Sequence, residues 1–134
     1  MGFESISDSW HRLLDRETWK TIFLTPEWQS AWWELFDDGT ADLKLLTIGP
    51  LSKPLGLAPL MLTESTLAFV GNADLFDYHD FVGVTPGFYE ALVECLKDEP
   101  WQTMDLCSIP AFSPTVTELP VALESIGCQV TIEE

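Results

Sequence analysis

The residues best able to do chemistry lie close together, between positions 72 and 80. This segment contains an amide, carboxylates, a phenol and an imidazole: Asn72, Asp74, Asp77, Tyr78, His79 and Asp80. An imidazole can accept a proton from a reacting amine, and a neighbouring carboxylate can orient the reacting group. The segment therefore predicts His79 as a candidate general base, with Asp77 and Asp80 as candidate orienting carboxylates.

Two other interpretations of this polar segment compete with catalysis. Asn and Asp side chains end turns by bonding nearby backbone, and a tyrosine ring can pack while its hydroxyl meets a carbonyl. For Tyr78 and Asp80 this structural interpretation is favoured. A metal site, with Asp74 as a further ligand, is not expected. In an extended chain, Asp77 and His79 lie on the face opposite Tyr78 and Asp80.

Tryptophan and cysteine supply the remaining reactive or stacking side chains. Trp28 and Trp32 have the spacing of a helix core, whereas Trp33 falls at the margin and is expected to be half exposed. The cysteines are odd in number and widely spaced, with no CxxC pair, so we expect small buried hydrophobes in a reducing compartment. No motif places a Cys or Ser near a His, so nucleophilic catalysis is not predicted.

The charge of the chain disfavours two classes of partner. Its 134 residues carry a formal net charge of −16, and no Lys or Arg lies between Pro54 and Leu96 or after Lys97. Such a surface repels phosphate backbones and anionic lipid, so neither nucleic acid nor membrane is an expected partner. Because the sequence has no basic segment followed by an apolar run at its start, we expect a cytoplasmic protein, with a single domain over residues 1–134.

Residues 81–97 are the stretch around which the fold is expected to form. Residues 81–84 are an apolar run that predicts a buried strand, and Thr85-Pro86-Gly87 predicts a turn. From residue 88 onward the apolar side chains recur with helical spacing: Phe88, Ala91, Leu92, Cys95 and Leu96. A strand, a turn and an amphipathic helix in this order form half of a βαβ unit.

The rest of the chain predicts three more helices and five more strands. The helices are expected at 9–14 with Asp8 or Ser9 as cap, at 26–36 with Thr25 as cap, and at 113–126 with a kink or break at Pro120. The strands are expected at 43–48, 56–63, 66–70, 103–109 and 128–132, with the first two forming a hairpin and Pro59 at an edge or a bulge. The buried stripe of the second helix is predicted as follows: Trp28, Ala31, Trp32, Leu35 and Phe36.

The resulting order, α-α-β-β-β-β-α-β-α-β, predicts an α/β fold with a mixed sheet and helices on both sheet faces. Short motifs accompany this order: Phe23-Leu24-Thr25-Pro26-Glu27-Trp28, Ala31-Trp32-Trp33, Gly56-Leu57-Ala58-Pro59-Leu60-Met61, Phe69-Val70-Gly71, Asp77-Tyr78-His79-Asp80-Phe81 and the strand from Trp101 to Leu106. With them the chain resembles the GNAT superfamily of acyl-CoA N-acyltransferases, and more narrowly the N-terminal half of the bacterial CelD-like and FemAB-like tandem-GNAT acyltransferases.

One stretch departs from the pattern of that family. A cofactor-binding GNAT domain has a Q/R-x-x-G-x-G/A loop before its central helix, where free amides approach the coenzyme A diphosphate. Here the turn is Thr85-Pro86-Gly87-Phe88, with one glycine, no basic residue and a proline that removes a donor. We therefore expect no cofactor in this domain. The resemblance implies that acetyl-CoA or another acyl-CoA binds a C-terminal GNAT domain of the same chain.

The resemblance also implies a function for the polar segment. It would form the substrate-facing wall of a cleft, with Asn72, Asp74, Tyr78 and Trp33 as substrate-binding residues, in an enzyme that transfers an acyl group to an amine. The chain by itself is then expected to be inactive. Two alternatives stay open. The chain can be a non-catalytic binding or dimerisation module, including a homodimer, or a small active acyltransferase with an unusual loop.

Overall fold

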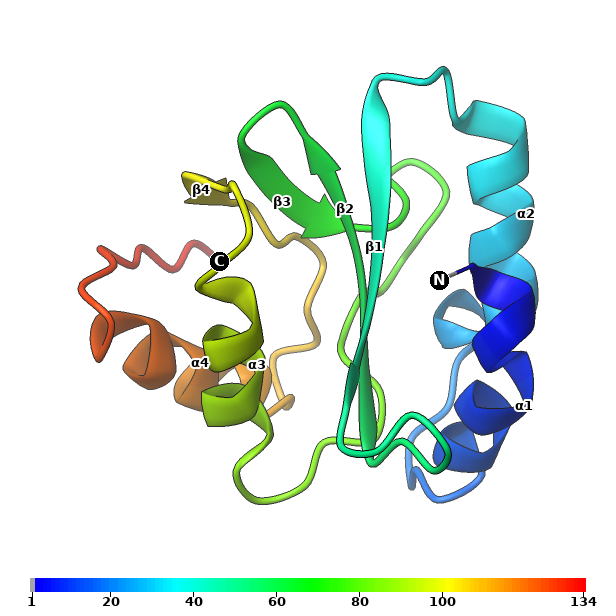
Figure 1. The fold of residues 1–134 in the computed structure, drawn as a ribbon, viewed down its shortest axis with the longest axis horizontal. Helices are drawn as coiled ribbons and strands as arrows, with labels where there is room; N and C mark the ends of the chain where they lie inside the picture. Colours follow the sequence, from blue (N-terminus) through cyan, green and yellow to red (C-terminus); the bar gives the residue numbers. More distant parts are fainter. Residues whose placement is uncertain (1) are drawn as a thin grey trace.

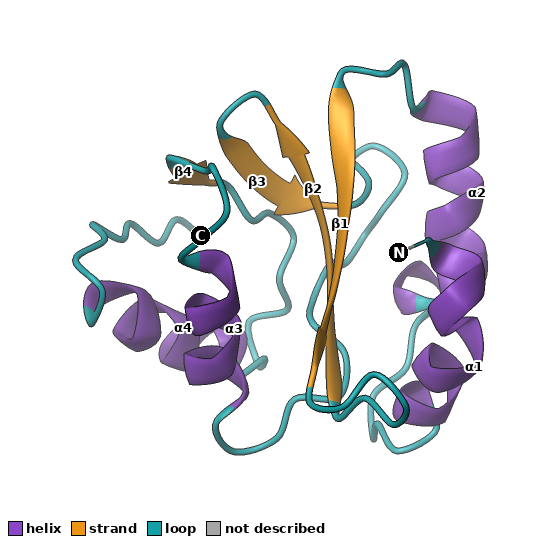
Figure 2. Cartoon of the chain, viewed as in Figure 1, coloured by secondary structure: helices purple, strands orange, loops and turns teal. Residues whose placement is uncertain are grey.

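A computed structural model describes residues 2–134 and shows a mixed sheet between two layers of helices (Figure 1). In chain order the elements are α1 (Phe3–Leu14), the 3-10 helix η1 (Ile22–Leu24), α2 (Pro26–Phe36), β1 (Ala41–Ile48), β2 (Gly56–Thr63), β3 (Thr66–Phe69), α3 (Phe88–Leu96), β4 (Thr103–Met104) and α4 (Thr115–Glu124). The helices α1 and α2 cover one face of the sheet, and α3 and α4 cover the other (Figure 2). The predicted α/β class, with a mixed sheet and helices on both faces, is confirmed.

The sheet has the order β1-β2-β3-β4. Its first two pairs are antiparallel, and β4 runs parallel to β3. Because successive side chains of a strand point to opposite faces, β1 places Leu45 in the core under α1 and α2, and Leu46 against the core under α3 and α4. The predicted hairpin of the first two strands is confirmed, from Ala41 opposite Thr63 to Ile48 opposite Gly56.

The polar segment lies on an excursion of the chain beside β2. On that side Leu60 faces Phe69 of β3, and nearer the start of β2, Leu57 faces Val82 in an isolated antiparallel bridge. Had the pairing continued unbroken, Leu57 would face Asn72; it faces Val82, ten residues farther along. The chain therefore stops pairing with β2 after β3 and pairs with it again at Val82. Residues 70–81 between these points, which we call the excursion, carry the whole polar segment.

Three predicted strands are shorter than expected or do not form. The stretch 81–84 is reduced to the single bridge at Val82, 103–109 forms only the two residues of β4, and 128–132 has no strand partner. In each case the local pattern is apolar, but the chain lacks a neighbouring backbone along most of the segment. Pattern alone cannot supply that partner.

The helix starts follow the capping rules only in part. Thr25 caps α2 as predicted, and its hydroxyl accepts a hydrogen bond from the Trp28 amide over 3.2 Å. The first helix begins earlier than predicted, at Phe3 after Gly2, and α4 runs through Pro120 without a break. Pro120 is the sixth of the ten residues of α4, so the Val116 carbonyl receives no amide hydrogen bond from it, yet the helix continues to Glu124.

The predicted buried stripe of α2 is correct only in part: Trp32 packs against the core and Trp28 is half-buried, but Ala31, Leu35 and Phe36 are exposed. Pro26 and Gln29 are the buried residues of this helix, whereas Leu35 is 77% exposed and Phe36 is 52% exposed. The helix turns its N-terminal half toward η1 and the excursion, where the Trp28 indole donates to the Leu75 carbonyl over 3.2 Å. At its C-terminal end, Trp32 and Trp33 pack against the core under α1 and α2, whereas Leu35 and Phe36 remain in solvent.

The buried face of α3 and the burial of the cysteines also differ from the sequence-based expectation. The buried side of α3 holds Tyr89 and Val93 in place of Ala91 and Cys95. Cys95 and Cys107 are exposed and Cys128 is partly buried, so the expectation of three buried cysteines is wrong. A shift of one residue in the inward face of a helix moves such a position from core to solvent.

Pro59 lies in the central strand β2, opposite Leu45, and not at an edge or a bulge. Its carbonyl accepts from the Val70 amide over 3.0 Å, one residue beyond the end of β3. In an antiparallel pair of this kind, the two residues normally exchange both hydrogen bonds. Because proline has no N–H, the Val70 carbonyl is left without a strand donor at the point where the excursion begins.

Candidate functional site

The excursion separates the predicted polar residues into an outer and an inner group. Asp74 and Asp77 are exposed, and Tyr78 is 41% exposed. The Asn72 side chain stabilises the local turn, because its Oδ1 accepts a hydrogen bond from the Leu75 amide over 3.0 Å. His79 turns inward, and its amide donates to the carbonyl of Ser108 over 3.0 Å.

The imidazole of His79 is enclosed by aromatic rings and is only 1% exposed. It stacks between Phe69, with centroids 5.5 Å apart, and Phe76, with centroids 4.6 Å apart. Burial lowers the pKa of His79 from 6.5 to about 4, because the charged ring loses its hydration, and the backbone carbonyls of Cys107 and Val70 offset this only in part. The ring is therefore neutral at pH 7 and lies out of reach of a substrate in solution.

One atom of this ring has no partner. Within residues 2–134, His79 Nε2 is buried and makes no hydrogen bond. The other ring nitrogen, Nδ1, lies 3.9 Å from Cys107 Sγ. This contact brings a thiol beside an imidazole, which no motif in the sequence indicated. An imidazole with a pKa of about 4 is a weak acceptor for a thiol proton, so the contact does not form an activated nucleophile.

Asp80 joins a chain of buried hydroxyls. Its Oδ1 accepts from Thr115 Oγ1 over 2.7 Å, and Thr115 Oγ1 lies 2.7 Å from the Tyr89 hydroxyl. An ionised carboxylate only accepts, so the threonine hydroxyl donates to Asp80 and the Tyr89 hydroxyl donates to the threonine. Burial raises the pKa of Asp80 despite the bonds from Ser113, Thr115 and the Phe81 amide. Burial likewise raises the pKa of Tyr89.

The outer group forms an aromatic surface that the sequence did not reveal. Tyr78 packs edge-on against Trp19, with centroids 5.2 Å apart, and Phe112 packs against the same indole at 5.1 Å. Phe112 is 67% exposed, and the indole of Trp19 is half-buried. These three residues, the aromatic trio, come from three loops far apart in the sequence. No local pattern could have joined them.

Trp33 lies elsewhere, at the C-terminal end of α2. It lines a groove of about 180 Å³ between α2, the start of β1 and the end of β2, together with Trp32, Phe36 and Met61. It is half-buried, as its place at the margin of the helix stripe predicted. No ring contact or hydrogen bond within the described residues links Trp33 to the excursion, so the predicted substrate-binding residues do not form one wall in this structure.

The turn before α3 offers little to an anion. Gly87 is the N-cap at φ 86° and provides no side-chain cap, and the Phe88 amide is already bonded to the Thr85 carbonyl over 3.0 Å. Glu90 lies in the first turn, where a negative side chain disfavours a second negative group. This is the turn in which the sequence lacks a Q/R-x-x-G-x-G/A loop.

The described residues give two further results. No group of three or more His, Cys, Asp or Glu side chains in residues 2–134 is arranged to hold a metal ion. No helix in that range is long and apolar enough to cross a bilayer. Comparison with known protein families, with characterised proteins and with solved structures finds no match to this chain.

Proposed function

We propose that this chain is a substrate-side, cofactor-deficient GNAT-like domain of an acyl-CoA-dependent N-acyltransferase. In this proposal it binds the amine that receives the acyl group. The acyl-CoA itself binds a further GNAT domain of the same protein, which is cytoplasmic and bacterial. The observation that carries the proposal is the aromatic trio of Trp19, Tyr78 and Phe112, exposed beside the acidic segment.

The chemistry of the trio favours a cationic ligand. Aromatic ring faces attract ammonium and guanidinium groups, by about 0.5–1 kcal/mol at exposed sites. Asp77 is exposed next to Tyr78 in the sequence, and the net charge of −16 raises the local concentration of cations. An acyl acceptor amine is protonated before it reacts, so this surface suits its arrival. Removing that proton would fall to another domain, because His79 is buried.

The first experiment measures binding and activity of the chain as it stands. Titration calorimetry with acetyl-CoA should show no binding, and thiol release from acetyl-CoA with an amine present should stay at the uncatalysed rate. Micromolar binding of acetyl-CoA, or turnover by the chain, would instead support the small active acyltransferase with an unusual loop. Continuation of the reading frame past Glu134 into a domain with the glycine loop would support the proposal directly.

The acceptor surface is tested with the methylamide of Nα-acetyl-lysine as probe. Tyr78→Ala and Phe112→Ala should each weaken its binding, measured by Trp19 fluorescence or by chemical-shift changes. Leu51→Ala removes an equally exposed apolar side chain, 72% exposed, outside the trio and serves as the matched control. Equal binding by all three variants would place the acceptor elsewhere.

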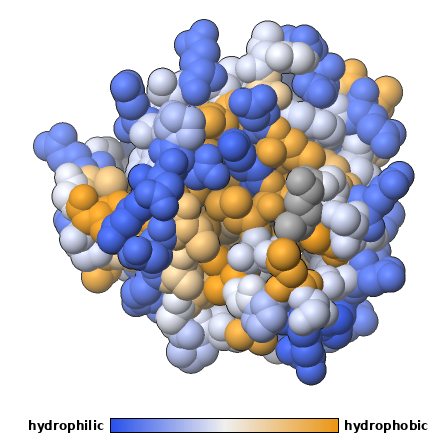
Figure 3. All heavy atoms as spheres, in the orientation of Figure 1, coloured by the Kyte–Doolittle hydropathy of each residue, from blue (hydrophilic) through white to orange (hydrophobic). Residues whose placement is uncertain are grey.

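A second candidate function, a non-catalytic binding or dimerisation module, is favoured by a different surface. Leu35 and Phe36 are exposed at the end of α2, and β1 is an outer strand of the sheet. Apolar side chains also gather over the middle of the face that carries β1 (Figure 3). Analytical ultracentrifugation of the wild type and of Leu35→Glu separates the two functions. A dimer lost on substitution supports the module, and a monomer in both supports the acceptor-binding domain.

A further inference from the structure

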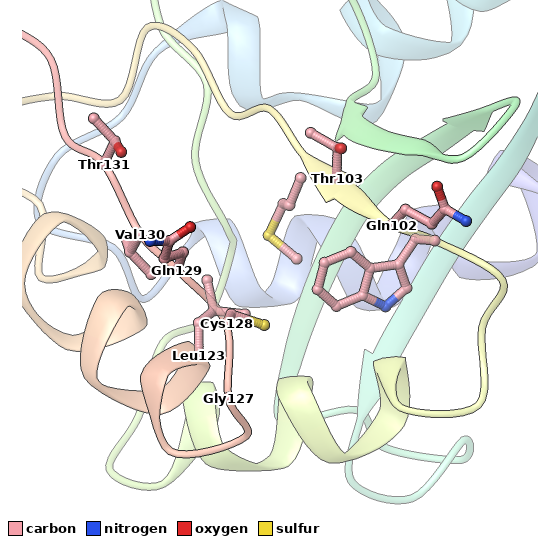
Figure 4. Close-up of a pocket in the computed structure, with 10 residues that line it drawn as sticks. Gln102, Thr103, Leu123, Gly127, Cys128, Gln129, Val130 and Thr131 are labelled. Atoms are coloured by element: carbon pink, nitrogen blue, oxygen red, sulfur yellow. The ribbon is translucent and has the colours of Figure 1, made fainter.

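A groove of about 640 Å³ lies at the other end of the sheet from β1. One side is β4 with Trp101 and Gln102, and the other is the chain from Gly127 to Thr131, with Leu123 of α4 also lining the groove (Figure 4). Neither the predicted catalytic residues nor the aromatic trio line it. Its volume is within the usual range for ligand sites, about 300–1,000 Å³.

One side of this groove is an unpaired sheet edge. The amides of Thr103 and Asp105 donate to the carbonyls of Ser65 and Leu67, over 3.1 and 2.8 Å, so these two residues face β3. Backbone groups of successive strand residues point to alternate sides, and Met104 therefore directs its N–H and C=O away from β3. Neither group has a backbone partner.

The opposite side is also without backbone partners. After the Cys128 amide, which donates to the Leu123 carbonyl over 3.1 Å, residues 129–134 make no backbone–backbone hydrogen bond. This is the segment that the sequence predicted as a last strand. It runs back toward β4 but does not pair with it (Figure 1). Within residues 2–134, the N–H and C=O of Met104 on one side and the backbone of residues 129–131 on the other thus border the groove without backbone partners, and such groups gain from a further backbone between them.

The charges of the lining and of the segment that supplies it favour a ligand with an uncharged middle and basic ends. No Asp, Glu, Lys, Arg or His lines it, so its middle suits uncharged side chains. The segment that supplies the groove lining, from residue 98 onward, has no Lys or Arg, and its charged residues are all acids: Asp98, Glu99, Asp105, Glu118, Glu124, Glu133 and Glu134. One of them, Glu99, is paired with Lys44 of β1 over 3.2 Å. A second copy of this chain would bring the same acidic charge, whereas a basic peptide is attracted.

We propose that this groove binds an extended peptide strand, uncharged in its middle and basic at its ends, which adds to the sheet beside β4. Main-chain hydrogen bonds to Met104 fix the register, and the neutral polar side chains of Gln102 and Gln129 border the strand. Addition of a strand to a free sheet edge is a recurring mode of peptide recognition. The inference stands independently of the acyltransferase proposal.

The probe is the octapeptide Lys-Lys-Thr-Val-Thr-Val-Lys-Lys, blocked at both ends, and the binding assay is titration calorimetry. Hydrogen exchange followed by NMR should show the Met104 amide protected only when the peptide is present. Replacing the lysines by glutamates should abolish binding. Two N-methylated versions of the octapeptide, one with the odd and one with the even backbone nitrogens methylated, test the main-chain hydrogen bonds. Only one of these two groups of N–H donors faces β4, so methylation should abolish binding in one version and not in the other.

Met104→Pro and Met104→Ala form a matched pair on the protein side. Both remove the side chain, but only proline removes the outward N–H, which no strand uses. We expect Met104→Ala to retain binding and Met104→Pro to weaken it about tenfold, the effect of one lost hydrogen bond. The methylated peptides test the same bond in the wild type, so the result does not depend on the folding of the proline variant.

Several results would overturn this proposal. They are equal affinity for the lysine and glutamate peptides, equal affinity of the two Met104 variants, and indifference to methylation of either set. Protection of Met104 without peptide, rising with protein concentration, would show that a second copy fills the groove.

Discussion

The imidazole of His79 stacks on the ring of Phe76, with 4.6 Å between centroids and 15° between planes. Phe76 also meets Phe23, Trp28 and Trp32, so the stack connects the excursion to η1 and α2. The residue that the sequence singled out as a proton acceptor is thus a member of an aromatic core. Its titration is linked to folding more directly than to catalysis.

Stability should fall as the pH drops from about 6.5 to about 4. The folded-state pKa of His79 is about 4 and the ordinary value is 6.5, so in this window the unfolded chain binds the extra proton. The contribution of the neutral His79 ring to the free energy of unfolding is complete above pH 6.5. It is lost on acidification, and the loss reaches up to about 3 kcal/mol. Urea unfolding at several pH values measures it.

Two variants of His79 separate titration from packing. His79→Phe and His79→Gln differ in shape and polarity, but neither can bind the proton. Both should therefore show a flatter stability curve between pH 4 and 6.5 than the wild type, whatever their stability at pH 7. A curve that stays as steep as the wild type in both variants would assign the acid loss to other groups.

Replacing Thr115 by valine should cost about 1–3 kcal/mol of unfolding free energy. The valine leaves the Tyr89 hydroxyl without its acceptor and Asp80 without its nearest side-chain donor, in a buried site. Thermal or urea unfolding of Thr115→Val measures the loss, with Thr115→Ser as the control that restores the hydroxyl. Equal losses in both variants would show that the methyl group, not the hydroxyl, matters.

Asp80→Asn should be at least as stable as the wild type at pH 7. The pKa of Asp80 is raised by burial, so the folded chain binds the proton more readily, and the ionised carboxylate lowers stability as the pH rises through that pKa. The amide oxygen can still accept from Thr115. The advantage should disappear in acid, and the exposed Asp77→Asn should change stability by no more than about 0.5 kcal/mol at either pH.

Gly71→Ala should destabilise the chain by more than Gly39→Ala. Both glycines have positive φ, 125° and 84°, but a Cβ on Gly71 overlaps the Phe76 ring and a Cβ on Gly39 meets no atom within 4 Å. The Gly39 variant measures the cost of the backbone conformation, about 1–2 kcal/mol. The difference between the two unfolding free energies combines the collision with Phe76 and the larger backbone cost at φ 125°, and equal values would mean that Phe76 moves freely.

Leu35→Glu should leave stability within about 0.5 kcal/mol of the wild type, because Leu35 is 77% exposed. Leu92→Ala, at a residue with 0% exposure in α3, should cost about 2–5 kcal/mol. Chemical denaturation of both variants compares the two helices. A large loss of unfolding free energy in Leu35→Glu would show that Leu35 is a core residue, as the apolar spacing of α2 predicts.

The sequence predicted those features that depend on neighbours along the chain. The Thr25 cap and the hairpin of β1 and β2 follow from residues a few positions apart. The face that a helix buries depends on what lies beside it, and at the end of α2 the core meets Trp32 and Trp33 but not Leu35 or Phe36. The regular apolar spacing of α2 therefore predicted core positions that the rest of the chain does not cover.

The candidate site divides in the same way. The position of the polar segment in a loop was predictable, since residues 71–79 are rich in turn formers. The aromatic trio and the contact of Cys107 with His79 were not, because each joins loops separated by many residues. The burial of His79 depends on Phe69 and Phe76, which come together only when the excursion folds over β3.

The interrupted pairing beside β2 makes the excursion an insertion between two points that both pair with β2. The strand resumes at Val82 on the line that it left after Phe69, so the ladder sets no fixed length for the insert. Mutation can change the exposed positions of that insert, such as Asp74, Asp77 and Tyr78, while Phe76 and His79 stay in the core and the hairpin keeps its register. The chemistry of this protein is therefore free to diverge at one place without redesign of the scaffold.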